Sequence, residues 1–397
     1  MNSYVIEGAK LFNVHRPGWE EGNLFIENGK FIKAPIHDDQ RKRMDAHGCF
    51  VMPGLIDAHC HIGLFEDAVG PDGEDGNEMT DPVTPQLRAI DGIYPMDRTF
   101  KEALEGGVTT AVTGPGSANV IGGQFAAVKT WGRTVEEKLL RAPVAMKVAF
   151  GENPKRVYNS QKKTPMTRMA TASILREALY MATEYREKKN QATADPSKLP
   201  AFDLRWESLI PVLEKKIPLK VHAHRADDIM TAIRIAEEFG LRLTLDHCTE
   251  GHLIADILSQ KGYPAIVGPS LGDRPKVELR NLTFETPRIL VEAGMTIALM
   301  TDAPVIPLKH LLLCAQFAVK NGLDRNEALI AITWNPARII GIDDRVGALD
   351  PGLDADLVIF NGDPLDFNSS VEAVFVNGNP VFTAEQSSFR TIPDIYA

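Results

Sequence analysis

The segment VMPGLIDAHCHIG, residues 51–63, ends a short apolar run in two histidines one residue apart, directly after a Pro-Gly step. Successive side chains of a strand alternate in direction, so we expect His59 and His61 to share one side and Cys60 to take the other. A buried strand has little use for paired imidazoles, whereas a metal site uses them as ligands. The segment therefore suggests a metal site at the end of a strand.

The bulk properties of the chain indicate a globular protein. Its 397 residues are 44% hydrophobic and 24% charged, which fits a barrel of roughly 250 residues with a smaller domain. The net charge of -10 argues against nucleic acid and anionic membranes as partners. No apolar run is long enough to span a bilayer, and the first residues lack the pattern of a signal peptide. Four scattered cysteines do not form a disulfide framework, so we expect a cytoplasmic enzyme.

Both ends of the chain have the alternating pattern of β-strands. Residues 4–12, 22–34 and 49–54 alternate apolar and polar side chains, as do 355–364 and 371–382. Asn28-Gly29 and Asn377-Gly378 are strong signals for hairpin turns. We therefore predict a small β-sandwich domain formed by both termini, residues 1–53 plus 345–397, around a catalytic domain of residues 54–344.

The middle of the chain alternates strands and helices. We expect strands within 54–63, 108–114, 143–151, 217–224, 241–248, 264–270 and 295–304. Amphipathic helices are expected within 166–189, 228–240, 250–262, 286–294, 307–322 and 325–341. Repeated strand–helix units imply parallel strands, and their number approaches eight, so we predict an α/β fold of the (β/α)8 TIM barrel type. The acidic, Gly- and Pro-rich stretch 64–95 and the Gly-rich GPGSANVIGGQ, residues 114–124, are expected to be loops around the barrel mouth.

Further polar residues follow the later strands. His222 and His224 end one strand, His247 ends the next, and Asp302 ends the last. Because TIM barrels carry their sites at the carboxyl ends of their strands, these residues should converge with the first histidine pair. Neutral imidazoles and carboxylates bind zinc and related ions, and such an ion lowers the pKa of a bound water and polarises a carbonyl. Asp302 is the candidate to move the proton.

These residues carry a resemblance to a known family. The segments PGLIDAHCHIG, KVHAHRADD, LDHCTEGH and TDAPV resemble the amidohydrolase superfamily, in the branch of imidazolonepropionase and prolidase-like dipeptidases. The C-terminal VGALDPGLDADLVIFNGDP resembles the segment that returns the chain of that superfamily to its small β domain. The resemblance covers nearly the whole chain and is specific for the superfamily rather than for a substrate.

The resemblance implies a role for each strand-end residue. His59 and His61 would bind the more buried metal, His222 and His247 the second, and Asp302 would touch the first metal and act as general acid and base. We take His222 rather than His224 as the ligand because the histidine of the family it resembles directly follows the strand's apolar residue, which here is Val221. His224 and Arg225 are then candidates for contact with substrate.

The fourth strand offers two possible bridging ligands. Two-metal members of the superfamily bridge their ions with a carboxylated lysine or a glutamate, and VAMKVAFGENPKR contains Lys147 in mid-strand and Glu152 beyond the strand end. Their odd separation puts them on opposite faces of a regular strand, so only one should point inward. We slightly favour Glu152, since barrel sites are built from strand ends, and keep a carboxylated Lys147 as the alternative.

Three functions remain open on the sequence. The leading hypothesis is a two-metal hydrolase of an amide, cyclic amide or peptide C–N bond, with two divalent ions per chain, zinc in the first place or manganese, iron or cobalt. The second is a one-metal deaminase or imidazolonepropionase-type ring-opening enzyme, in which His247 polarises the substrate. The third is a non-catalytic scaffold of the same shape. We expect a small-molecule substrate and, from the resemblance, a homo-oligomer.

Overall fold

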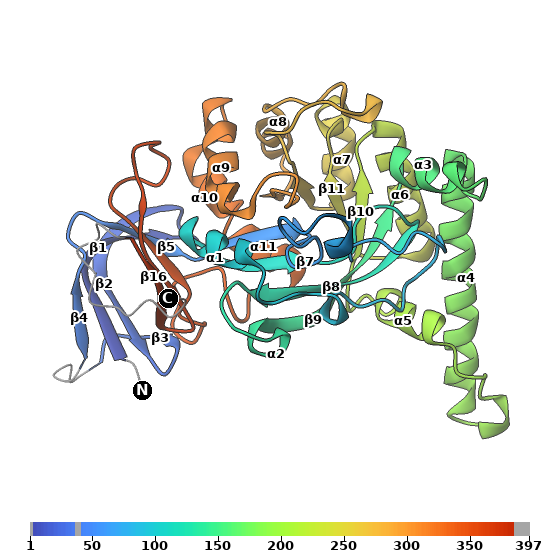
Figure 1. Cartoon of the computed structure of the whole chain (residues 1–397), viewed down its shortest axis with the longest axis horizontal. Coiled ribbons are helices and arrows are strands. Elements are labelled where there is room, and N and C mark those ends of the chain that lie inside the picture. Colours follow the sequence, from blue (N-terminus) through green and yellow to red (C-terminus); the bar gives the residue numbers. More distant parts are fainter. Residues whose placement is uncertain (1–2, 36–40, 385–397) are drawn as a thin grey trace.

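The computed structural model describes residues 3–35 and 41–384, and its strands form two sheets (Figure 1). The first sheet joins both ends of the chain in the order β16-β15-β14-β5-β1-β2-β3, with β4 paired to β1. Its strands are β1 (Ser3–Asn13), β2 (Gly18–Glu27), β3 (Lys30–Ile32), β4 (Lys42–Asp45), β5 (Phe50–Pro53), β14 (Leu357–Phe360), β15 (Val371–Val376) and β16 (Asn379–Thr383). The prediction that both termini contribute to one sheet is therefore confirmed.

Both predicted Asn-Gly hairpins are present in this sheet. Glu27 pairs with Lys30 across the first turn, and Val376 pairs with Asn379 across the second. Asn28 and Asn377 have φ angles of 52° and 49°, and the glycine that follows each has a positive φ as well. Two successive positive φ angles match the right-handed twist of the flanking strands, which is why Asn-Gly is favoured there.

The second sheet forms a nearly closed barrel in which the strands follow one another in chain order. They are β6 (Leu55–Cys60), β7 (Val108–Thr113), β8 (Ile121–Lys129), β9 (Leu139–Ala149), β10 (Leu219–Ala223), β11 (Leu243–His247), β12 (Ala265–Val267) and β13 (Ile297–Leu299). Asp57 of β6 accepts hydrogen bonds from the backbone N–H and the hydroxyl of Thr301, just after β13, at 2.9 and 2.6 Å. These bonds hold the first and last strands together and confirm the barrel fold.

Helices occupy most of the connections between barrel strands and cover the barrel from outside (Figure 1). They are α1 (Arg98–Glu105), α2 (Val135–Lys138), α3 (Glu152–Ser160), α4 (Arg168–Ala192), α5 (Leu204–Leu213), α6 (Ala226–Phe239), α7 (Ala255–Lys261), α8 (Thr286–Glu292), α9 (Leu311–Lys320), α10 (Arg325–Ile330) and α11 (Trp334–Ile340). No helix of the described residues is long and apolar enough to cross a membrane.

One strand departs from the prediction of parallel strand–helix units. The Gly-rich segment after β7 is not wholly a loop, because Ile121–Lys129 forms β8, which runs antiparallel to β7 and β9. The connection from β7 is too short for a helical crossover, so the chain returns in the opposite direction. Gly123 of this segment has to be a glycine, because an added Cβ would lie 2.6 Å from the carbonyl oxygen of Leu87. The missing side chain lets the 64–95 loop pack directly on β8.

A buried ion cluster joins the barrel to the sheet of the termini. Asp354 accepts from Arg345 at 2.8 Å and from Lys30 at 2.5 Å, and it lies 3.2 Å from the ammonium of Lys129, which also pairs with Asp356. Lys129 ends barrel strand β8, whereas Asp354 and Asp356 precede β14 of the other sheet. The domain limits inferred from the sequence stay a prediction, but this cluster ties the two sheets together electrostatically.

Asp354 gives a testable stability prediction. Burial alone would raise the pKa of Asp354, but the hydrogen bond from Arg345 and the charges of Lys129 and Lys30 outweigh it and lower the pKa to about 2. Because folding lowers this pKa, the stabilisation is complete above about pH 5 and is lost as the pH falls from about 4 to about 2. We expect Asp354→Asn to lower the free energy of unfolding by about 2 kcal/mol or more at pH 7.

Urea titrations at pH 7 and pH 3 measure this difference. The difference in the free energy of unfolding between wild type and Asp354→Asn should be smaller by roughly half at pH 3 than at pH 7. Asp344→Asn, which removes an exposed partner of Arg141, serves as the matched control and should change stability little. A gap that is equal at both pH values would contradict the assignment.

Candidate functional site

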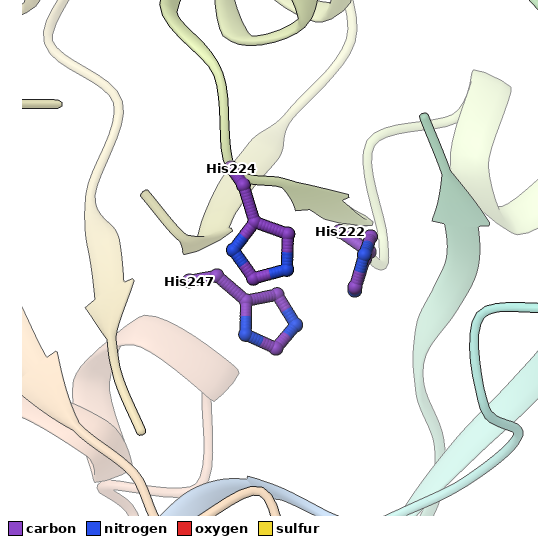
Figure 2. Close-up of side chains that lie close together, drawn as sticks. All are labelled: His222, His224 and His247. Carbon is purple, nitrogen blue, oxygen red and sulfur yellow. The ribbon is translucent and has the colours of Figure 1, made fainter. Parts of the chain in front are cut away.

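The carboxyl ends of the parallel barrel strands meet at one pocket of about 350 Å³, which His61, His222, His224, His247 and Asp302 line. Two groups of side chains lie there, and within each group the possible ligand atoms are all within 4.8 Å of one another. The first cluster is His59, His61 and Asp302, and the second cluster is His222, His224 and His247. Figure 2 shows the three rings of the second cluster grouped around one point. The structure thus brings together the histidines and the aspartate that the sequence singled out.

In the first cluster, each imidazole is oriented by an acceptor behind it. Nδ1 of His61 donates to the carbonyl oxygen of Gly114 at 2.7 Å, and Nδ1 of His59 lies 2.5 Å from Oδ2 of Asp246. A carbonyl can only accept, so Nδ1 of His61 carries a proton, and in a neutral ring Nε2 carries a lone pair. Nε2 lies 3.2 Å from Oδ1 of Asp302. With a neutral ring, two potential ligand atoms face each other at this distance, and a cation could bind between them.

The second cluster repeats this arrangement. Nδ1 of His247 donates to the carbonyl oxygen of Gly268 at 2.8 Å, and Nδ1 of His224 is bonded to the hydroxyl of Thr249 at 2.8 Å. Nε2 of His247 is buried and has no hydrogen-bond partner among the described residues. A buried acceptor without a donor is costly in a folded protein, and a bound cation would satisfy it.

The surroundings keep these imidazoles neutral. Burial lowers the pKa of His59, His222 and His247 well below the usual value, and neighbouring positive groups add to the effect. Burial also lowers the pKa of His224 to about 3. Only the neutral ring has a free lone pair, so at neutral pH the four rings have the protonation state that metal binding requires.

Two site residues have an unusual backbone conformation. His247 has a φ angle of 68° and Asp302 a φ angle of 54°, in the left-handed region that residues other than glycine seldom adopt. Each lies where a barrel strand gives way to its loop. Such conformations cost of order 1–3 kcal/mol each and persist where the surrounding structure fixes them, often at functional sites.

The structure separates the two candidates on the fourth barrel strand. Lys147 of β9 is fully buried, and its Nζ lies 3.1 Å from Nε2 of His59. Burial lowers the pKa of Lys147 to about 8, although Asp246 and Asp302 oppose the shift. Glu152 is the first residue of α3 and belongs to neither cluster. The slight preference for Glu152 over Lys147 therefore does not agree with this geometry.

Arg225 is not brought to the pocket. Its guanidinium pairs with Asp227 through two hydrogen bonds of 2.9 Å at the start of α6, and it does not line the cavity. His224 does line the cavity, as expected of a residue that contacts substrate. The choice of His222 over His224 as ligand stays open, because both rings belong to the second cluster.

Sequence reasoning missed three buried charged residues around the clusters. Asp246 of β11 pairs with His59 and also with Lys220 of β10, at 2.9 Å. Both stand within apolar strands, at LTLDHC and PLKVHAH, where a charged residue at an inward position is a recognisable signal. Glu278 lies in the loop after β12 and is only 1% exposed. No periodic pattern marks that loop, so its position could not be read from the sequence.

The comparisons with known proteins agree with this fold and site. The profile described as "Amidohydrolase family" matches residues 212–382. A solved structure of an amidohydrolase from Thermotoga maritima MSB8 is 45% identical, covers 96% of this chain and all of its own, and superposes with a TM-score of 0.93. The chain belongs to the amidohydrolase family.

Two curated relatives are more distant. The amidohydrolase tasK of Hapsidospora irregularis is 28% identical over 92% of this chain, which spans 40% of the length of tasK. An imidazolonepropionase from Thermoplasma volcanium is 24% identical, and the alignment covers 91% of both chains. Both relatives align along more than nine-tenths of this chain, as the solved Thermotoga maritima structure does.

The contact between Asp246 and His59 gives a prediction for metal affinity. A carboxylate behind a metal-binding imidazole fixes its tautomer and raises its basicity, and loss of such a partner typically costs 10–100-fold in affinity. We therefore expect Asp246→Asn to lower the affinity for one metal ion by about that factor. Competition with a chromophoric chelator measures this affinity. Asp256→Asn, which changes an exposed acid on α7, is the control. Equal affinities in wild type and Asp246→Asn would refute the role given to Asp246.

Proposed function

We propose that the protein is a two-metal amidohydrolase that cleaves the C–N bond of an amide, a cyclic amide or a small peptide. The observation that carries the proposal is the pair of facing ligand atoms in the first cluster, Nε2 of His61 and Oδ1 of Asp302, 3.2 Å apart. The unpartnered Nε2 of His247 adds a buried lone pair to the same pocket. The four imidazoles and the Asp302 carboxylate that line the pocket suit zinc, manganese, iron or cobalt.

The residues divide between two ions. His59, His61 and Asp302 would hold the first, and the second cluster, with His222 and His247, would hold the second. Bound divalent ions would activate a water molecule for attack and polarise the substrate carbonyl. Lys147 would bridge the ions if its amine took up carbon dioxide, forming an N–C bond and releasing a proton. Its depth in β9, next to His59, supports this role over a role for Glu152.

Asp302 would serve as general base and then general acid. Its carboxylate lies at the pocket, 14% exposed, within 3.5 Å of both imidazoles of the first cluster. From there it could accept a proton from the attacking water and deliver it to the leaving nitrogen. The left-handed backbone at Asp302 aims this short side chain and supports a fixed position during proton transfer.

The pocket suits a small, partly apolar substrate. Phe65, Leu279, Leu282, Pro304 and Val305 form its apolar wall, and Lys276 contributes an ammonium group. A volume of about 350 Å³ lies at the lower end of the range for small-molecule sites. N-acyl amino acids, small dipeptides and cyclic amides with an anionic group fit this combination.

A second candidate is a one-metal ring-opening hydrolase or deaminase. The observation that favours it is the similarity to an imidazolonepropionase along nine-tenths of both chains. In that case His59, His61, His222 and Asp302 would hold one ion, and His247 would polarise the substrate. The number of ions per chain separates the two candidates.

Elemental analysis of gently purified protein gives that number. We expect about two transition-metal ions per chain, because two separate clusters offer ligand sets. Removal of the ions with a strong chelator should abolish hydrolysis, and their return should restore it. A value near one ion per chain would favour the second candidate. Lys147 would then have no second ion to bridge.

Replacement of Asp302 tests the chemistry. Asp302→Asn keeps the size of the side chain and one ligand oxygen but removes the base, so turnover should fall by about 10²–10⁴-fold. The metal content should stay nearly intact, which elemental analysis of the same sample would show. Asp256→Asn again serves as a remote control. Wild-type turnover in Asp302→Asn would refute the proposed mechanism.

A further inference from the structure

Glu278 presents an unpaired carboxylate oxygen to the second cluster. The side chain is 1% exposed, and Oε1 has no hydrogen-bond partner among the described residues. Oε1 lies 3.8 Å from Nε2 of His224 and 4.0 Å from Nε2 of His222. Lys276 is the nearest ammonium group, at 3.9 Å, which is beyond hydrogen-bonding distance. One oxygen of this buried carboxylate is therefore left without a hydrogen-bond donor, next to imidazoles.

The fold holds this carboxylate in place from behind. Oε2 of Glu278 accepts a hydrogen bond of 2.8 Å from the backbone N–H of Glu152, at the first turn of α3. Gly151 makes room for it, because an added Cβ there would lie 2.5 Å from Oε2. One oxygen is thus anchored at the N-terminus of α3, and the other is aimed at the histidines.

The spacing fits ligands of a single ion. Two ligands of one zinc ion can lie at most about 4.2 Å apart, which is twice a bond of about 2.1 Å. Both distances from Oε1 to the imidazole nitrogens are below that limit. The unpartnered Nε2 of His247 belongs to the same cluster, and it too is an acceptor. A cation held between Oε1 and the imidazoles of His222 and His224 would satisfy the orphaned oxygen.

We propose that Glu278 joins His222 and His224 as a ligand of one metal position that is complete without the bridging lysine. This inference rests on the metal-binding part of the proposed function and deepens it, because it adds Glu278 and His224 as ligands. Two imidazoles and one carboxylate suit zinc or cobalt better than calcium or magnesium, which prefer all-oxygen sites. The ion at this position therefore binds independently of carbon dioxide, whereas a bridge through Lys147 requires it.

Metal titration of the full-length protein distinguishes these ligand sets. Chelator-stripped wild type, Lys147→Met and Glu278→Gln are titrated with Zn²⁺ in buffer freed of carbon dioxide. We expect Lys147→Met to keep one ion per chain with an affinity within a few-fold of wild type. Glu278→Gln should lower the affinity for that same ion by at least about 10-fold. Glu152→Gln is the matched control, since it changes a neighbouring carboxylate outside the cluster and leaves the anchoring N–H in place.

A second measurement on wild type guards against misfolded variants. Anomalous diffraction at the zinc edge should place an ion within about 2.2 Å of Oε1 of Glu278. An ion bound only to His222 and His247, or equal affinities in wild type and Glu278→Gln, would overturn this inference and leave the proposed function standing. A wild-type protein that binds no transition metal under any loading condition would instead refute the proposed function.

Discussion

The site depends on which nitrogen of each buried imidazole carries the proton. Asp246 and the carbonyl oxygens of Gly114 and Gly268 accept hydrogen bonds from Nδ1 of His59, His61 and His247, so that in a neutral ring Nε2 is left with a lone pair. A histidine without such a partner can exchange the two tautomers, and part of its population would then present a donor. The barrel therefore fixes ligand chemistry with groups that never touch the pocket themselves.

These acceptors come from structural features that serve the fold as well. Gly114 follows β7, at the short connection that reverses the chain into antiparallel β8, and Gly268 follows β12. Asp246 stands on β11 immediately before His247, where the strand ends and the backbone turns into the left-handed conformation. The irregularities of this barrel are thus concentrated where they orient the imidazoles.

The sequence predicted the part of the site that strands deliver directly. His59, His61, His222, His247 and Asp302 follow apolar runs, and parallel strands bring the residues at their carboxyl ends to one end of the barrel. The choice between Lys147 and Glu152 stays a prediction, because it depends on how deep a long side chain reaches from mid-strand rather than on which residue comes last. The termini were easier, since Asn-Gly turns and alternation specify hairpins locally.

Two features could not be predicted because tertiary packing decides them. The direction of β8 follows from a connection whose length is visible, but its glycines are explained only by the 64–95 loop that packs on Gly123. Glu278 lies in a loop without a periodic pattern, and its proximity to the histidines depends on the anchoring N–H of Glu152. When a residue is positioned by a contact with a distant segment of the chain, the residues next to it in the sequence carry no pattern that predicts its position.

The position of Lys147 links the two clusters chemically. Its amine lies 3.1 Å from Nε2 of His59, where it can donate to the lone pair that an ion in the first cluster would use. One lone pair cannot serve both, so binding of that ion requires the amine to give up its role as donor. Conversion of the amine to a carbamate replaces a donor by acceptor oxygens and a positive charge by a negative one. In the proposed two-metal site, binding of the first ion would therefore be coupled to a change at Lys147.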